Sequence, residues 1–202
     1  MRLPGDQLVA LLIAISFAAG LNVYATVATL GLLGHYDLVT LPQSLHLLAG
    51  WWVIGASAAL FGVGFFADKI PGFDLVWNTL HTFIRVPLAA LLAWRATDNL
   101  TPGEQLAATF LGGVVALVAH SGKTAARAAV TPSPEPLSNA GLSLGEDTLS
   151  IALTWLATKH PFVAGGIALA LIVVIILFIR WAWKSLRNLF ERAGNLLQPR
   201  TG

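Results

Sequence analysis

The chain has 202 residues, of which 56% are hydrophobic and 11% are charged, and its mean hydropathy is +0.73. A soluble domain carries about 25% charged residues, so this composition indicates an integral membrane protein with little mass outside the bilayer. The net charge of +2 says little by itself, and the absence of cysteine excludes thiol catalysis, disulfide bonds and cysteine-ligated metals.

The first predicted span runs from about Leu8 to Leu33 and is interrupted by the sequence Gly20-Leu21-Asn22. The N-terminal stretch has the length of a signal peptide, but its apolar sequence continues past the small residues of a cleavage site, which favours a retained span. Asn22 and Thr26 belong to a polar stripe in this span. Such stripes usually make hydrogen bonds between helices, and a substrate-lining role is the alternative.

The second predicted span, about Leu47 to Ala67, follows a short loop over residues 35–46. Ala58 and Gly62 have the spacing with which small residues allow two helices to come close. The span ends at residues 68–72, where proline and glycine predict a turn.

Residues 74–95 form the third predicted helix, which carries a polar line along an otherwise apolar rod. The members of the line stand at steps of 4, 3 and 4 and fall within roughly 60° of one another on one helix face. They are Asp74, Asn78, His81 and Arg85. Ionisable side chains in hydrocarbon are costly unless they face a bundle interior, a partner or water, so they are functional candidates. The line is either a path for a substrate or ion, or a set of polar contacts between helices.

The fourth predicted span begins near residue 104, with Pro102 at the first helical position, and stays apolar to residue 119. Its helical continuation turns basic. His120 and Arg127 share one face of this continuation, and Lys123 lies close beside them. The same pairing of histidine and arginine occurs in the third helix, which suggests that the two helices serve one region.

Alternating prolines over residues 130–139 predict an extended backbone after the fourth span. The next element, Leu142 to Thr158, is short and acidic at its start, so it is either a thin span or a re-entrant half-helix. Pro161 to Ile179 is the most apolar stretch of the chain. The basic, tryptophan-containing segment 180–202 is typical of a helix that lies on anionic headgroups. We therefore divide the chain into a membrane bundle, residues 1–179, and a basic cytoplasmic tail.

The distribution of basic residues favours the thin span. Six crossings put both ends of the chain on one side together with most of its Lys and Arg residues, as the positive-inside rule requires of the cytoplasmic side. A re-entrant element would leave the basic tail outside. We therefore expect six crossings, with both termini in the cytoplasm.

The third and fourth helices together supply His81, Arg85, His120, Lys123 and Arg127 to the predicted cluster. The acids grouped with them are fewer, namely Asp68, Asp74 and Glu135. Arginine binds phosphate or carboxylate bidentately and stays charged when desolvated, while histidines titrate near neutral pH. A cluster open to the cytoplasm would suit an anionic substrate or a lipid phosphate, with proton coupling. The alternative is internal salt bridges, from Asp74 or Asp68 to Arg85 and from Glu135 to Arg127.

Three stretches resemble an uncharacterised bacterial membrane family, domain of unknown function 4126. They are Gly20 to Thr26, Phe66 to Pro71 continuing through Asp74 and Trp77, and His120 to Lys123 continuing through Pro136 to Asn139. The resemblance covers most of Leu8 to Ile179 and leaves out the basic tail. It implies a multi-span protein of the bacterial inner membrane, and it implies no activity or substrate.

We expect an all-α polytopic bundle of about five or six spans with proline- and glycine-broken or re-entrant segments. The leading hypothesis is a transporter or flippase of a small anion or a phosphate-headed lipid. The alternatives are a non-transporting structural or assembly subunit and a membrane-embedded lipid-active enzyme. The predicted substrate-binding residues are Asp74, Asn78, His81, Arg85, His120, Lys123 and Arg127, and the predicted lining residues are Asn22, Thr26, Asp68 and Glu135. Membrane lipids are the expected partners, with a homo-oligomer as an option; we expect no nucleic acid, metal or cofactor.

Overall fold

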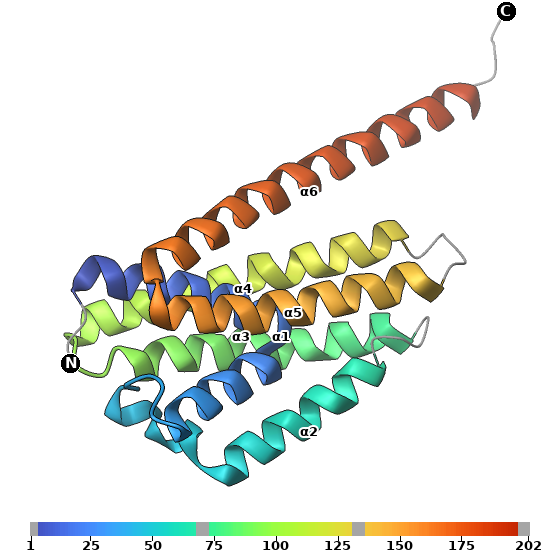
Figure 1. The fold of residues 1–202 in the computed structure, drawn as a ribbon. Helices are drawn as coiled ribbons and strands as arrows, with labels where there is room; N and C mark the ends of the chain where they lie inside the picture. Colours follow the sequence, from blue (N-terminus) through green and yellow to red (C-terminus); the bar gives the residue numbers. More distant parts are fainter. Residues whose placement is uncertain (1–3, 68–72, 131–135, 198–202) are drawn as a thin grey trace, which may run out of the picture.

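The computed structural model describes residues 4–67, 73–130 and 136–197, which form a bundle of helices (Figure 1). The α-helices are α1 (Gly5–His35), α2 (Trp51–Ala67), α3 (Phe73–Ala96), α4 (Pro102–Val130), α5 (Pro136–Lys159) and α6 (Pro161–Leu197), and the 3-10 helix η1 (Gln43–Ala49) precedes α2. No strand occurs among the described residues, so the predicted all-α fold is confirmed.

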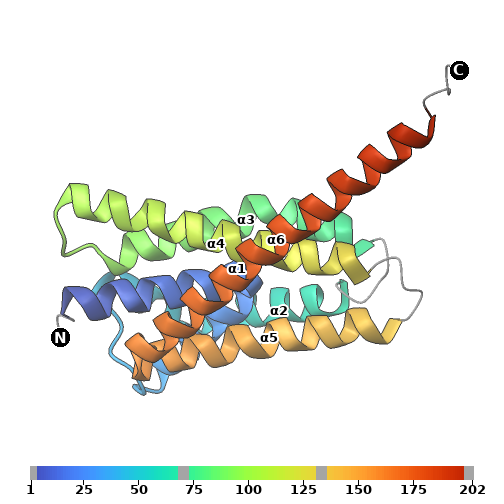
Figure 2. The same ribbon diagram turned by 90° about the horizontal axis from the view of Figure 1, so that it is seen from above.

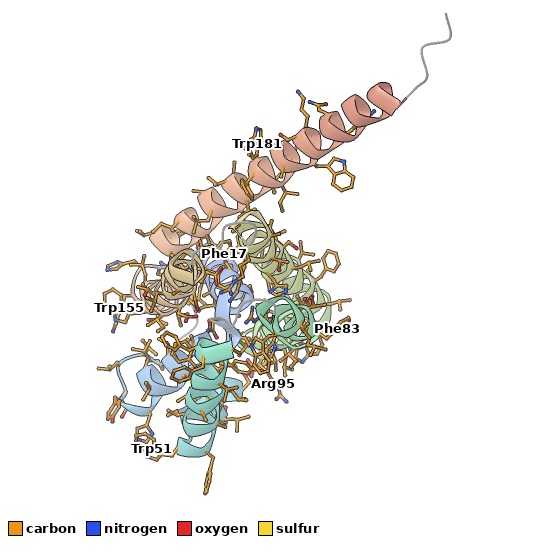
Figure 3. All side chains as sticks on the ribbon, turned by 90° about the vertical axis from the view of Figure 1, so that its right-hand side faces the viewer. Phe17, Trp51, Phe83, Arg95, Trp155 and Trp181 are labelled. Carbon is orange, nitrogen blue, oxygen red and sulfur yellow. The ribbon has the colours of Figure 1, made fainter. Side chains whose placement is uncertain are left out.

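Three of the described helices, α1, α4 and α6, are long and apolar enough to cross a membrane, and η1 with α2 adds a fourth if that bent pair is one broken span. Large apolar side chains also cover the outside of the bundle. Trp51, Phe83, Trp155 and Trp181 lie at its periphery, whereas Phe17 lies at its centre (Figure 3). The chain is therefore a membrane protein.

Helix α1 enters the bundle and then turns back. Its second half, after Asn22, runs toward the end of the bundle where its first half began (Figure 1). The loop after α1 lies at that same end, because Gly5 and Leu38 line one cavity and Lys159, at the end of α5, donates a hydrogen bond to the Leu38 carbonyl. We call this the entry end and the opposite one the far end. The sequence predicted an interruption at this point but did not predict the reversal of direction.

Helices α2 to α6 each run between the two ends (Figures 1 and 2). The described chain starts at the entry end, and α6 continues past the far end. The six-crossing prediction placed both termini together, and the number of crossings and the sides on which the termini lie stay predictions. The two half-helices of α1 reverse direction at Asn22, where the prediction assumed one straight crossing.

The element suspected of being re-entrant, Leu142 to Thr158, is part of the uninterrupted helix α5. Its 24 residues span about 36 Å, enough for a bilayer core of about 30 Å. The prediction of extended backbone through residue 139 is wrong, because α5 begins at Pro136. A proline is tolerated at the first helical position, where its missing N–H has no intrahelical partner. Residues 35–46, predicted as a loop, also hold the start of η1.

The predicted start of α4 is confirmed in detail. Pro102 is its first residue, and Thr101 with Glu104 forms a capping box. The Thr101 backbone N–H donates to Glu104 Oε2 at 3.0 Å, and the Thr101 hydroxyl donates to the same oxygen at 2.7 Å. This end of the helix therefore satisfies its own first polar groups.

Helix α1 is the centre of the bundle, since it contacts every other helix. Small residues make this possible. A Cβ on Gly20 would stand 2.4 Å from the Ala116 carbonyl oxygen of α4 and 2.8 Å from the Cβ of Ala119. By contrast, a Cβ on Gly62 of α2 would meet nothing within 4 Å, and Ala58 is exposed. The predicted close contact through Ala58 and Gly62 is therefore absent from the described part of the chain.

Helix α6 is continuous across the boundary predicted at residues 179 and 180. Its 37 residues reach about 55 Å, well beyond the thickness of a bilayer core. It packs on α1, α4 and α5 through small residues such as Ala164 and Ala168, and its second half projects away from the bundle (Figure 2).

Candidate functional site

The break in α1 is made by one residue. Asn22 has φ −149° and ψ 98°, outside the helical region, and its side-chain Oδ1 accepts a hydrogen bond from the Ala25 backbone N–H at 3.1 Å. This is the geometry of an N-cap, so Asn22 begins the second half-helix. The first half-helix ends just before it, which leaves carbonyl groups of its last turn without helical partners in the middle of the bundle.

Helix α5 supplies partners to this break. The Ser150 hydroxyl lies 3.0 Å from the Ala18 carbonyl oxygen and 3.1 Å from that of Asn22. Thr26 Oγ1 lies 3.1 Å from Ser150 Oγ, and the Asn22 side-chain amide donates to Asp147 Oδ1 at 2.8 Å. All of these groups are buried. The prediction that Asn22 and Thr26 make hydrogen bonds between helices is thus confirmed.

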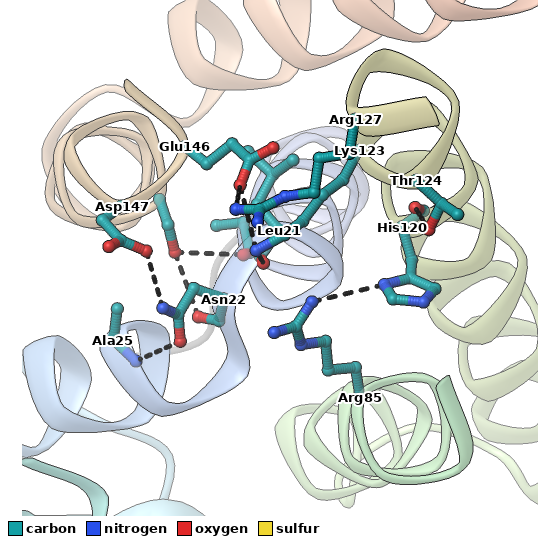
Figure 4. A network of polar contacts seen from close by, with 12 residues as sticks. Leu21, Asn22, Ala25, Arg85, His120, Lys123, Thr124, Arg127, Glu146 and Asp147 are labelled. Atoms are coloured by element: carbon teal, nitrogen blue, oxygen red, sulfur yellow. Dashed lines mark hydrogen bonds and ion pairs between the residues drawn. The ribbon is translucent and has the colours of Figure 1, made fainter. Parts of the chain in front are cut away.

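Helix α4 brings two cations to the same place (Figure 4). The Lys123 ammonium lies 3.5 Å from the Leu21 carbonyl oxygen, at the negative end of the first half-helix. It is also 3.0 Å from Glu146 Oε2, and Arg127 Nη2 lies 2.8 Å from that same oxygen. Lys123 and Arg127 are 3% and 1% exposed. One carboxylate from α5 therefore holds two buried cations from α4.

Helix α3 contributes Arg85, whose guanidinium points toward the same centre (Figure 4). Its Nη1 lies 3.4 Å from His120 Nδ1, and His120 Nε2 lies 2.7 Å from Thr82 Oγ1. Because a guanidinium can only donate, Nδ1 accepts and Nε2 carries the proton given to Thr82. This arrangement suits an uncharged His120, so Arg85 brings a third buried positive charge to the site.

His81 stands at the side of this network. Its Nδ1 lies 2.7 Å from the Trp77 carbonyl oxygen, and its ring packs against the Trp77 ring at 4.1 Å and edge-on to Tyr24 at 5.8 Å between centroids. The aromatic neighbours hold the imidazole between α3 and the second half of α1. Its described contacts therefore fix these two elements together.

Four predicted residues lie outside this description. Asp68 and Glu135 fall outside the described residues, and so do the side chains of Asp74 and Asn78. The salt bridges predicted from Asp74 or Asp68 to Arg85 and from Glu135 to Arg127 fall outside it for the same reason. The described carboxylate on Arg127 is Glu146.

Sequence analysis missed the contribution of α5. Buried polar residues follow one face of this helix at steps of 4, 3 and 4. They are Ser143, Asp147, Ser150 and Thr154. The same spacing identified the polar line of the third helix, so the signal was present in the sequence. The short apolar length of this element pointed instead to a thin span or a half-helix.

The described part of the site carries more positive than negative charge. Arg85, Lys123 and Arg127 face two described carboxylates, Glu146 and Asp147. Within the part of the chain that the structure describes, these three cations are at most 3% exposed, and the predicted opening to the cytoplasm stays a prediction. No group of three or more His, Asp or Glu residues that could hold a metal ion occurs within the described ranges.

A comparison with protein families finds one match. The family described as Domain of unknown function (DUF4126) matches residues 9–181, which confirms the resemblance seen in the sequence. No curated protein and no solved structure matches the chain.

Proposed function

We propose a transport function for this chain, which belongs to the family described as domain of unknown function (DUF4126). The substrate class is a small anion or a phosphate-headed lipid. The observation that carries the proposal is the gathering of Arg85, Lys123 and Arg127, all buried, around a break in an apolar helix. Charges at this depth in a membrane protein are costly and are kept for pathways and coupling.

The broken helix supports the same proposal. Non-helical backbone within a membrane is tolerated only where protein or a polar cavity surrounds it. In many transporters, discontinuous helices place the substrate and coupling-ion sites near the midplane, because half-helix ends present unpaired backbone groups. Here the ending half-helix presents the Leu21 carbonyl to Lys123. The same cation is therefore shared between the backbone and the carboxylate of Glu146.

The carboxylate of Glu146 occupies a position that a substrate anion can take. Its Oε2 is the atom that both Lys123 and Arg127 contact, and an oxygen of a phosphate or carboxylate can take the same place. A proton on Glu146 removes the charge that competes with the substrate. Binding of an anion together with a proton therefore leaves the net charge of the site unchanged. We infer proton-coupled anion movement, with Glu146 in the role that the sequence analysis gave to His81 and His120.

The orientation follows from the basic segment. Lys and Arg residues are frequent in α6 after Ile179, in the part that runs past the far end, and cytoplasmic segments carry such an excess. We propose that the far end faces the cytoplasm of a bacterial inner membrane and that the entry end faces outward. The C-terminus therefore stays in the cytoplasm, as the sequence predicted, whereas the start of the chain is proposed to lie on the outer side.

Proteoliposomes containing the full chain test the function. The probes are radiolabelled inorganic phosphate and sulfate for free anions, and headgroup-labelled phosphatidylglycerol for lipid flipping. We expect protein-dependent movement of at least one class of probe, faster with an inward proton gradient. In Lys123→Gln and Arg127→Gln the rate of probe movement falls about tenfold or more, since each variant loses a charge-assisted hydrogen bond worth roughly 1.5–3 kcal/mol. Glu146→Gln keeps movement and loses its dependence on the proton gradient.

Arg180→Gln is the matched control, because Arg180 is exposed on α6 away from the site. Arg127→Lys separates function from folding, since it keeps the positive charge near Glu146 and loses the planar guanidinium that can bind an anion bidentately. Transport that is unchanged in Lys123→Gln and Arg127→Gln, or no movement of any probe by folded wild-type protein, contradicts the proposal.

A further inference from the structure

A cavity of about 870 Å³ opens at the entry end, between the two halves of α1. Its deeper wall is apolar. Leu8, Leu12 and Ile15 come from the first half of α1, Leu30 from the second half, and Leu92 from α3. A volume of this size holds a ligand of several hundred daltons or a good part of a lipid. The volume and the apolar lining together suit an apolar group such as an acyl chain.

The bottom of the cavity is closed on the side of the polar site. Ser16 and Ala93 line the cavity there, and both pack closely against Gly112 of α4. A Cβ on Gly112 would lie 2.7 Å from the Ala93 Cβ and 3.0 Å from Ser16 Oγ. The cavity is therefore separate from the cations at the break in α1, and an inference about it does not rest on the proposed transport function.

The rim of the cavity is polar and carries both signs of charge. Asp98 lies in the loop between α3 and α4, and Lys159 is the last residue of α5. Both side chains are exposed. Lys159 Nζ lies 2.6 Å from the Leu38 carbonyl oxygen, which holds it at the rim and leaves two of its three N–H groups for other acceptors.

We propose that this cavity binds one membrane phospholipid with a zwitterionic phosphoethanolamine headgroup. An acyl chain occupies the apolar wall between the half-helices. The phosphate meets Lys159, and the ammonium meets Asp98. The charge pattern of the rim decides the headgroup, because an anionic lipid would pair with Lys159 and be repelled by Asp98. The location agrees with a lipid, since the loops at the end of a membrane bundle lie at headgroup depth.

Lipid analysis of the purified full chain tests the proposal. The protein is delipidated on a column, incubated with mixed micelles of equal phosphatidylethanolamine and phosphatidylglycerol, and its bound lipid is measured by mass spectrometry. We expect about one phosphatidylethanolamine per chain to resist washing. Leu8→Trp fills the cavity and reduces this retained lipid about tenfold. Val9→Trp is the matched control, because Val9 is 47% exposed on the outer face of the same turn, and it retains the lipid.

The headgroup is tested at the rim. Asp98→Asn removes the repulsion of anionic lipid, so the retained lipid shifts from phosphatidylethanolamine toward phosphatidylglycerol. In a second measurement that needs no variant, phosphatidylethanolamine with a photoreactive group at the chain end cross-links to the wall formed by Leu12 and Leu30. Equal lipid retention in Leu8→Trp and Val9→Trp, or cross-links confined to outer surfaces such as α6, means binding as ordinary boundary lipid and overturns the proposal.

Discussion

Helices α1 and α6 are both strongly apolar, but they occupy opposite environments. In α1, 72% of the most apolar stretch is buried inside the chain, whereas in α6 only 17% is. Lipid tails and a protein interior solvate apolar side chains about equally, so hydropathy does not distinguish the two helices. The distinguishing residues are the small and polar ones. Gly20, Asn22 and Thr26 let α1 approach and bond its neighbours, while α6 presents large side chains such as Val174 and Leu177 outward.

The sharpest test of this comparison concerns whether α1 crosses the membrane at all. The chain has no cysteine, so single cysteines can report the side on which they lie. Asp6→Cys and Leu38→Cys flank α1 at exposed positions, and Lys184→Cys lies on the second half of α6. Since α1 turns back and α6 does not, we expect the first two to react with a membrane-impermeant maleimide from one side of the membrane, and the third only from the other.

Val174→Cys is the control for lipid exposure, because Val174 is 60% exposed on the apolar part of α6 and should react from neither side of the membrane. Reaction of positions 6 and 38 from opposite sides would show that α1 crosses. The re-entrant arrangement of the half-helices and the outward side proposed for the start of the chain would then be wrong.

The next largest effect is expected when a buried charge is removed. Arg127→Leu leaves Glu146 with Lys123 alone in a closed interior, and breaking a buried pair in this way costs about 3–5 kcal/mol. Arg180→Leu, on the exposed face of α6, should change the free energy of unfolding by less than about 0.5 kcal/mol. Unfolding by SDS titration in mixed micelles measures both. Equal stability of the two variants would mean that the ion pair is open to water.

Local signals in the sequence identified several of the buried polar residues that the structure describes, and their role in binding a substrate stays a prediction. His81, Arg85, His120, Lys123 and Arg127 were singled out by helical spacing, and all five are buried. The interruption at Gly20-Leu21-Asn22 is where the helix breaks. These features succeed because spacing along a helix and capping chemistry depend on neighbours in the chain.

The remaining features depend on contacts between distant segments. Asn22 ends one helix and begins another, but the direction of the second half is set by its packing on α5, 125 residues away in the case of Asp147. The pairing of Glu146 with Arg127 also needs two helices to be placed side by side. The helical start at Pro136 was missed for a local reason, since proline is equally compatible with an extended loop and a first helical turn.

Close packing provides a third test, with one glycine in each helix. Gly20→Ala places a Cβ 2.4 Å from a backbone oxygen of α4, which cannot move away alone, so α1 and α4 must separate. We expect a loss of about 3 kcal/mol in the free energy of unfolding, at the upper end of overpacking costs. Gly166→Ala on α6 meets nothing within 4 Å, and should stabilise the helix by about 0.5 kcal/mol or leave it unchanged. Equal effects of the two alanines would contradict the close approach of α1 and α4.

The smallest effect is expected from a comparison of the capping residue at the break in α1 with an ordinary exposed polar residue of α6. Asn22→Ala removes the cap on the Ala25 N–H and the hydrogen bond to Asp147, and we expect a loss of about 2 kcal/mol. Asn188→Ala, at an exposed position of α6, should cost less than about 0.5 kcal/mol. The same SDS titration compares them. If Asn22→Ala is as stable as the wild type, the half-helices are held by packing alone. The break would then form without a polar residue, and the role of Asn22 would lie in its contacts within the site.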